Sequence, residues 1–122
     1  MSDVSAITMR SILMGLQRIR EESNELPISI LITLLGVAIY TPAGDTQQEL
    51  SILELSKKVG IPYSTTSRHL RYLGKFQYPG KPGLGLVDTG EMVMDRRQKY
   101  VVLTPKGQRF VAQVFTLMGV KA

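Results

Sequence analysis

The residues best suited to a chemical role lie between positions 63 and 75. Short hydroxyl side chains and cations follow one another there, with a tyrosine at the start: Tyr63, Ser64, Thr65, Ser67, Arg68, Arg71 and Lys75. Hydroxyl groups donate to phosphate oxygens, and arginine binds guanine or phosphate through two parallel hydrogen bonds. An ordinary solvated helix more often mixes glutamate with lysine. This set therefore favours contact with DNA, although many helical segments of similar pattern bind nothing.

A second group of cations lies at residues 95–99, which read Asp95, Arg96, Arg97, Gln98 and Lys99. Asp95 and Arg97 are two residues apart, close enough to pair across a tight turn and to fix it. The turn would then present Arg96 or Arg97 to a minor groove, where narrow A·T tracts concentrate negative potential. The alternative is that both arginines merely solvate the tip of a hairpin.

The net charge agrees with these two groups. The chain of 122 residues has 15 Lys and Arg against 10 Asp and Glu, a formal net charge of +5. Residues 61–122 contain ten basic and three acidic side chains, whereas residues 1–60 contain five and seven. A basic half on a small domain indicates either a polyanionic partner or a solubilising surface.

Other chemistry has little support in the sequence. Cysteine is absent, which excludes disulfides and thiolate sites. The single histidine, His69, has no cysteines and few carboxylates near it, so we expect neither a metal site nor a catalytic triad. We expect His69 to pack at the flank of its helix or to touch a phosphate. No enzymatic activity, cofactor or metal is predicted.

Two helices are predicted within the first 40 residues. Pro27 suits the first turn of the second one, which runs to about Tyr40 and is apolar nearly all round, so we expect it at the centre of the fold. Its apolar stretch, residues 28–39, is too short to span a bilayer, and no secretory signal peptide precedes it. Residues 4–23 indicate an amphipathic helix with an apolar stripe of Met9, Ile12, Leu13, Leu16 and Ile19.

Two short helices are predicted next. Ser51 and Glu54 match a capping box that opens the first, and Gly60 is its expected C-terminal cap. Pro62 starts the second, and the tight turn between the two makes a helix-turn-helix pattern in which residues 63–73 can enter a major groove. The side chains expected to face inward are Leu53, Leu55, Thr66, Leu70 and Leu73.

Loops, a hairpin and a last helix are expected elsewhere. Residues 41–48 and 74–85 are rich in glycine, proline or polar residues, so both are predicted to be irregular loops; the second could add DNA contacts or position the hairpin after it. Residues 86–94 and 99–103 read as the strands of a hairpin with a basic tip. Thr104 and Pro105 suit the start of a last helix, with an apolar face of Phe110, Val111, Val114, Phe115, Leu117 and Met118.

These elements predict an α+β fold that is mainly α, arranged as a single domain over residues 1–122. A helix-turn-helix followed by a basic hairpin is the winged-helix arrangement, here with a two- or three-stranded antiparallel wing and flanking N- and C-terminal helices.

Residues 95–107 resemble the wing signature of MarR-type transcriptional regulators, namely Asp-x-Arg, a three-residue spacer, Val-x-Leu-Thr and then Pro-x-Gly. Gly85-Leu86-Val87 is similar to the Gly-Leu-Val that opens the family's first wing strand, and the likeness covers about residues 48–108. It implies a sequence-specific double-stranded DNA-binding regulator, expected to be a repressor. Residues 63–73 would read the major groove, and the wing tip, residues 95–99, the minor groove or backbone.

The resemblance also implies a homodimer. Residues 1–40 would supply core and dimer contacts, residues 48–104 the helix-turn-helix and wing, and residues 105–122 further dimer contacts. Relatives usually continue with one or two more helices, whereas about 15 residues follow Gly107 here, as in a short, C-terminally truncated variant. This departure leaves the dimer geometry and any small-molecule effector open. It also favours an alternative: a winged-helix module for protein assembly or replication initiation with weak or no specific DNA binding.

The expected location is the cytoplasm of a bacterium or archaeon, or of a cell infected by the phage that encodes the chain. The lack of cysteine and of a signal peptide favours a reducing compartment. Bound to DNA, the protein would be associated with the nucleoid, and no membrane contact is expected.

Overall fold

The computed structural model describes residues 8–24, 26–41, 49–93 and 95–119. The predicted loop at 42–48, Met94 and positions 4–7 of the predicted first helix lie outside these ranges. Helix α1 (Met9–Glu22) opens at Thr8, whose hydroxyl accepts from the Ser11 amide while Ser11 Oγ accepts from the Thr8 amide. Helix α2 (Ile28–Tyr40) follows Pro27, which occupies the N-cap position and not the first turn.

Helices α3 (Ile52–Val59) and α4 (Tyr63–Leu73) form the predicted helix-turn-helix. Gly60 ends α3 with φ of 72°, a left-handed conformation that glycine adopts without a Cβ clash. The predicted capping box is only half formed. Ser51 Oγ accepts from the Glu54 amide at 3.0 Å, but among the described residues no bond returns from the Glu54 carboxylate to the Ser51 amide.

Leu53 was expected inside and is 42% exposed, so that prediction is wrong. Ile52, Leu55 and Ser56 are the buried residues of α3, because positions three and four apart share one face of a helix. Leu53 lies about 100° round the axis from Ile52, on the side that faces solvent.

Residues 74–85 were predicted to be an irregular loop, and this prediction is also wrong. Strands β1 (Phe76–Tyr78) and β2 (Lys81–Pro82) form a small antiparallel hairpin. Pro79 and Gly80 occupy the two central turn positions, and Gly80 has φ of 88°. Proline followed by a glycine with positive φ is the pattern of a type II turn, which explains why the segment reverses direction there. We call residues 75–82 the extra hairpin, because it is a second hairpin in addition to the predicted wing.

The predicted wing is present. Strands β3 (Val87–Glu91) and β4 (Lys99–Leu103) pair antiparallel, in a register that runs from Val87 opposite Leu103 to Glu91 opposite Lys99. Ser51 adds an isolated antiparallel bridge to Tyr100 on the other edge of β4. The wing is therefore two-stranded, with one residue of a third strand.

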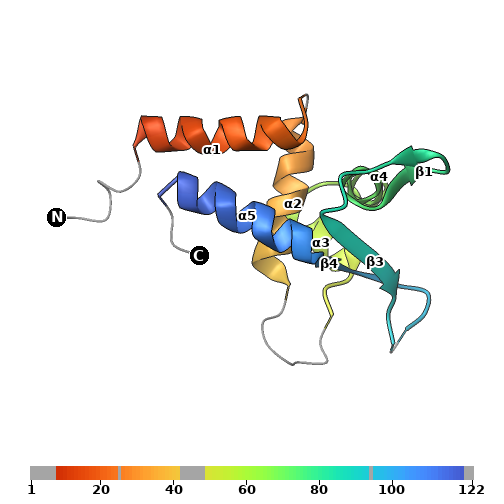
Figure 1. The fold of residues 1–122 in the computed structure, drawn as a ribbon. Helices are drawn as coiled ribbons and strands as arrows, with labels where there is room; N and C mark the ends of the chain where they lie inside the picture. The colour runs from red at the N-terminus through yellow and green to blue at the C-terminus, as the bar shows by residue number, and fades with distance from the viewer. Residues whose placement is uncertain (1–7, 25, 42–48, 94, 120–122) are drawn as a thin grey trace.

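Helix α5 (Pro105–Leu117) begins as predicted, with Thr104 Oγ1 accepting from the Gly107 amide at 3.0 Å and Pro105 in the first turn. It packs against α1, and the two helices lie on one side of the molecule, with α3, α4 and the wing on the other (Figure 1).

Helix α2 lies at the centre, as predicted, and contacts α3, α4, α5 and β4. Leu34 and Val37 of this helix are fully buried. The core also includes Ile19, Ile30, Leu50, Ile52, Leu55, Leu70, Leu73, Leu86, Val87, Val101, Phe110, Val111 and Val114. Among the described helices, none is both long enough and apolar enough to cross a membrane.

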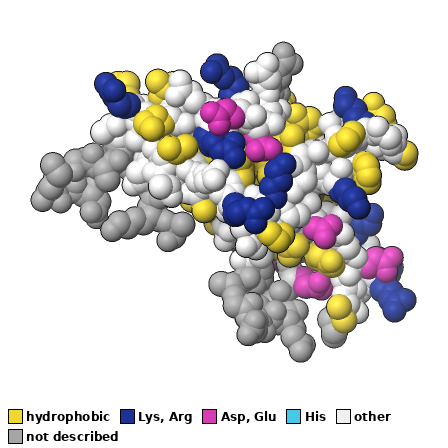
Figure 2. Space-filling view, in the orientation of Figure 1, with side chains coloured by type: hydrophobic (Ala, Val, Ile, Leu, Met, Phe, Trp, Pro, Cys, Tyr) yellow, Lys and Arg dark blue, Asp and Glu magenta, His cyan; other side chains and the backbone are white. Residues whose placement is uncertain are grey.

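The apolar stripe of α1 is largely outside this core. Only Ile19 of the stripe is buried, while Leu13 is 54% and Leu16 48% exposed. Figure 2 shows hydrophobic side chains at the surface over α1, at the upper left. The helix is amphipathic as predicted, but one chain covers only the end of its apolar face.

Candidate nucleic-acid interface

Helix α4 turns one face into the core and leaves the opposite face free. Thr66, His69, Leu70 and Leu73 are buried. Tyr63, Ser64, Arg68 and Arg71 are exposed, and Thr65 and Ser67 are partly exposed. The face that carries the predicted DNA contacts is therefore the face that solvent, or a ligand, can reach.

His69 anchors α4 to the centre of the fold. Its Nδ1 lies 2.9 Å from the Thr33 hydroxyl, which itself donates to the Ser29 carbonyl at 3.1 Å. Since the single hydroxyl proton is used in that second bond, His69 Nδ1 carries a proton and donates to Thr33. Burial, followed by the charge of Arg68, lowers the pKa of His69 below its ordinary value of 6.5. Of the two expectations for this residue, packing at the helix flank is the one observed.

The wing tip is organised by Asp95. Its Oδ1 accepts from the Arg97 amide at 3.1 Å and from Arg97 Nε at 3.3 Å, and its backbone carbonyl accepts from the Gln98 amide at 2.9 Å. The Arg97 side chain is 92% exposed, so the ion pair is screened by water and is weak. Asp95 thus shapes the turn, while the Arg97 side chain remains almost fully exposed to solvent.

The wing is held firmly at its base. The Thr104 hydroxyl donates to the Gly85 carbonyl at 2.7 Å, and the Thr104 amide donates to the Leu86 carbonyl at 3.0 Å. The backbone of Leu86 lies so close to Gly107 that a Cβ there would clash with it. The threonine and glycine of the wing signature therefore fasten the hairpin to the first turn of α5.

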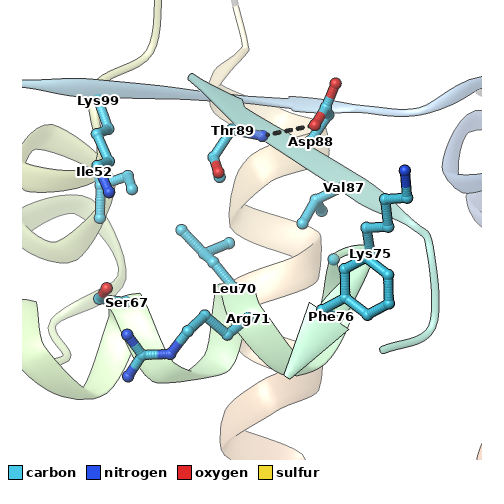
Figure 3. Close-up of a pocket in the computed structure, with 11 residues that line it drawn as sticks. Ile52, Ser67, Leu70, Arg71, Lys75, Phe76, Val87, Asp88, Thr89 and Lys99 are labelled. Carbon is cyan, nitrogen blue, oxygen red and sulfur yellow. Dashed lines mark hydrogen bonds between the residues drawn. The ribbon is translucent and has the colours of Figure 1, made fainter. Parts of the chain in front are cut away.

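Two adjoining hollows separate α4 from the wing. The first is lined by Leu53 and Tyr63 on the helical side and by Arg97, Gln98 and Lys99 on the wing. The second has Ser67, Arg71 and Lys75 on one side and Asp88, Thr89 and Lys99 on the other (Figure 3). Lys99 borders both, so the exposed face of α4 and the wing form one continuous basic surface, which we call the α4–wing surface.

The structure thus brings together six of the predicted contact residues at the two hollows: Tyr63, Ser67, Arg71, Lys75, Arg97 and Lys99. Ser64, Arg68 and Arg96 are exposed but border neither hollow, and Thr65 accepts from Arg68 Nη2 at 3.4 Å. Among the described residues, the ion pairs include neither Arg68, Arg71 nor Lys99.

Four residues that border these surfaces were not named individually as DNA contacts by the sequence, although Gln98 lies in the predicted wing tip and Phe76 and Tyr78 lie in the 74–85 segment that could add contacts. Leu53 and Gln98 line the first hollow. Phe76 lines the second, and Tyr78 lies close to Arg68 and Arg71. The signal that could have found the last two was the Pro79-Gly80 turn, which places aromatic and basic residues on a hairpin next to α4.

Several solved structures share this fold. The chain is similar to MepR of S. aureus in a complex with DNA, with 18% identity over 86% of this chain and 73% of that chain and a TM-score of 0.66. A transcriptional regulator from Thermotoga maritima matches with 19% identity over 88% of this chain and 64% of its own, at a TM-score of 0.62. MarR matches with 17% identity over 87% and 69% of the two chains, at a TM-score of 0.59.

These likenesses establish the fold. No protein-family model and no curated protein matches the sequence. The structural matches confirm the predicted winged-helix fold of the MarR type, mainly helical with a small antiparallel wing. The chain spans between 64% and 73% of the length of the three solved chains named above.

Proposed function

We propose that this chain, which has the fold of MarR-type regulators, is a sequence-specific double-stranded DNA-binding transcriptional regulator. The observation that carries the proposal is the α4–wing surface. Arg71 of α4 and Lys99 of the wing border the same hollow, and Lys99 also borders the hollow between Tyr63 and Arg97. Helix α4 would enter the major groove, with Arg68 and Arg71 directed to base edges and Ser64, Thr65 and Ser67 to phosphates or bases. Tyr63 would lie beside the groove wall.

The wing would contact the minor groove or the neighbouring backbone. Arg96 and Arg97 lie at its tip, and Asp95 stabilises the turn by accepting hydrogen bonds from the amide and Nε of Arg97. Lys75 and Lys99 line the hollow between α4 and the wing, and we assign them to phosphates of the backbone. The complex of MepR with DNA supports this interpretation, because that protein shares the arrangement of helices and wing.

A homodimer is the second part of the proposal. The stripe of α1 exposes Met9, Leu13 and Leu16, and α2 exposes Ile28, Ile32 and Ile39. An apolar surface of this kind is typical of a face that another chain covers. Two copies joined there would present two α4 helices to successive major grooves and would bind a two-fold symmetric site.

Repression is the regulatory outcome that we propose, since a dimer that occupies a promoter blocks polymerase without further contacts. The protein would act in the cytoplasm, where it would be bound to the nucleoid.

In vitro selection of duplexes from a random pool tests the proposal directly. We expect enrichment of a palindromic sequence, which would establish base readout and two-fold symmetry together. The absence of any mobility shift with selected or random duplex at 50 mM salt would contradict DNA binding. It would favour the alternative of a winged-helix assembly module, in which the apolar stripe of α1 binds another protein.

A further inference from the structure

The extra hairpin, residues 75–82, presents aromatic rings and lysines to solvent. Phe76 is 51% and Tyr78 59% exposed. Lys75 Nζ lies 5.7 Å from the centre of the Phe76 ring, and Lys81 Nζ lies 5.8 Å from the centre of the Tyr78 ring, within the range of a cation–π contact. Each exposed ring thus has a cation beside it, and the surface is both apolar and positive (Figure 2).

Backbone hydrogen bonds fix the extra hairpin to the end of α4. The amides of Gly83 and Leu84 donate to the carbonyls of Lys75 and Tyr72, at 2.9 and 3.0 Å, and the Leu86 amide donates to Leu73 at 2.7 Å. At Gly83 a Cβ would clash with carbonyl oxygens of the last turn of α4 and of Gly74. The segment that follows the return strand therefore packs directly on the end of α4, which fixes the position of the extra hairpin relative to the helix.

The extra hairpin and α4 also share a basic hollow. Its lining includes Arg68 and Arg71 from α4 and Gln77 and Tyr78 from the extra hairpin. Arg71 borders this hollow as well as the one next to the wing. In Figure 1 the extra hairpin lies beside α4 at the right, and the wing lies below both. The sequence contains no Asp or Glu from residue 55 to residue 87, so no carboxylate of this segment offsets the cations.

We propose that the extra hairpin is a second DNA-contacting element, which binds phosphates of the duplex beside the last turns of α4. The inference rests on the proposed function, since α4 must lie in the major groove for the hairpin to reach the groove wall. Lys81 and Lys75 would bind phosphates, and the Tyr78 hydroxyl would donate to the same strand. DNA is favoured over a protein partner because each aromatic ring carries a cation and the flanking hollow is arginine-rich.

The salt dependence of DNA binding tests the inference. Binding of a 40-base-pair duplex of mixed sequence is measured by fluorescence anisotropy between 50 and 200 mM salt, for the full chain and its variants. The slope of log K against log salt is negative, and each lost phosphate contact makes it shallower by about 0.9. We expect Lys81→Gln to make the slope shallower by about one and to reduce the affinity at 50 mM salt. Lys75 is left unchanged in this test because it also borders the hollow next to the wing.

Matched variants separate this inference from the proposed function. Arg109→Gln removes one charge from the exposed side of α5 and should leave the slope unchanged, whereas Lys81→Arg keeps the charge and should retain wild-type binding. If the wild type binds DNA and Lys81→Gln shows the wild-type slope and affinity, the hairpin does not contact DNA and the inference fails while the proposed function stands. If the wild type binds no duplex at 50 mM salt, both fail. Circular dichroism melts establish that the variants are folded.

Discussion

The imidazole of His69 donates from Nδ1 to the hydroxyl of Thr33 over 2.9 Å, and this bond joins the proposed recognition helix α4 to the central helix α2. Both side chains are buried. The orientation of α4, and with it the direction in which Arg68 and Arg71 point, depends on this contact as well as on apolar packing.

The pH dependence of stability follows from the lowered pKa of His69. In the unfolded chain this group titrates near 6.5, and in the folded chain it titrates lower. As the pH falls through 6.5, the unfolded state takes up a proton that the folded state does not, so the free energy of unfolding decreases until the folded-state pKa is reached. Urea unfolding between pH 8 and pH 5 should show this decrease in the wild type. In His69→Gln the same interval should show a smaller decrease, and equal decreases in the two proteins would contradict the prediction.

Removal of the Thr33 hydroxyl should destabilise the fold. Thr33→Val keeps the shape of the side chain but leaves the buried Nδ1 proton of His69 without an acceptor, at a cost of about 1–3 kcal/mol. Chemical denaturation gives the free energy of unfolding. The control is Ile32→Val, next to it on α2 but exposed, for which we expect a change of less than about 0.5 kcal/mol. If Thr33→Val has the same free energy of unfolding as the wild type, water or another group must accept the hydrogen bond from His69 Nδ1.

Leu53 and Leu55 offer a matched pair on α3. Leu55 is fully buried and Leu53 is 42% exposed. Leu55→Ala should cost about 2–5 kcal/mol because it leaves a cavity against α2, whereas Leu53→Ala should change stability by less than about 0.5 kcal/mol. Thermal unfolding of the two variants compares them directly. Similar losses in both would mean that Leu53 is covered in solution, for example by the wing residues with which it shares a hollow.

Base readout and phosphate contact should differ in their effects on DNA binding. Arg71→Ala should weaken binding to a selected site by about 1–3 kcal/mol and relax the base preference at one position, and Arg68→Ala should behave similarly. Lys99→Ala should weaken selected and random duplexes alike and flatten the salt slope by about one. Anisotropy titrations on both kinds of duplex measure this. An equal loss on both for every variant would mean that α4 contacts only the backbone.

The apolar stripe of α1 should control the oligomeric state. Leu13→Glu/Leu16→Glu places two charges on the exposed stripe, so we expect a dimeric wild type to become monomeric, because a charge buried in an apolar interface lacks a partner. Light scattering at micromolar concentration gives the mass. Both leucines are about half exposed in the single chain, so the melting curve of the monomer should remain cooperative. A wild type that is already monomeric would contradict the two-fold arrangement.

Much of the fold could be predicted from short, local signals. Gly60 and Pro62 mark the turn between α3 and α4, and Thr104 and Pro105 mark the start of α5, because caps and prolines act on backbone groups a few residues away. The spacing of Thr66, Leu70 and Leu73 identified the buried face of α4, which left its hydroxyl and arginine side chains outside. The wing followed from two apolar runs with a polar tip between them.

Other features could not be predicted because they depend on contacts between distant segments. The exposure of Leu53 and of the α1 stripe depends on which elements a single chain packs against them. The position of His69 against Thr33 depends on how α2 and α4 cross in the core. The extra hairpin had a local signal in Pro79-Gly80, but its attachment to α4 requires the close approach at Gly83.

The sequence by itself determined the order of the helices and the wing, the caps of α3 and α5, and which side chains carry charge, since these follow from capping, periodicity and residue type. Only the tertiary structure decided that Arg71 of α4 and Lys99 of the wing border the same hollow, and that Lys99 also borders the hollow beside Tyr63. The physical reason is that residues about 30 positions apart are brought together by burial of the apolar faces behind them, and no local pattern encodes the distance at which they meet.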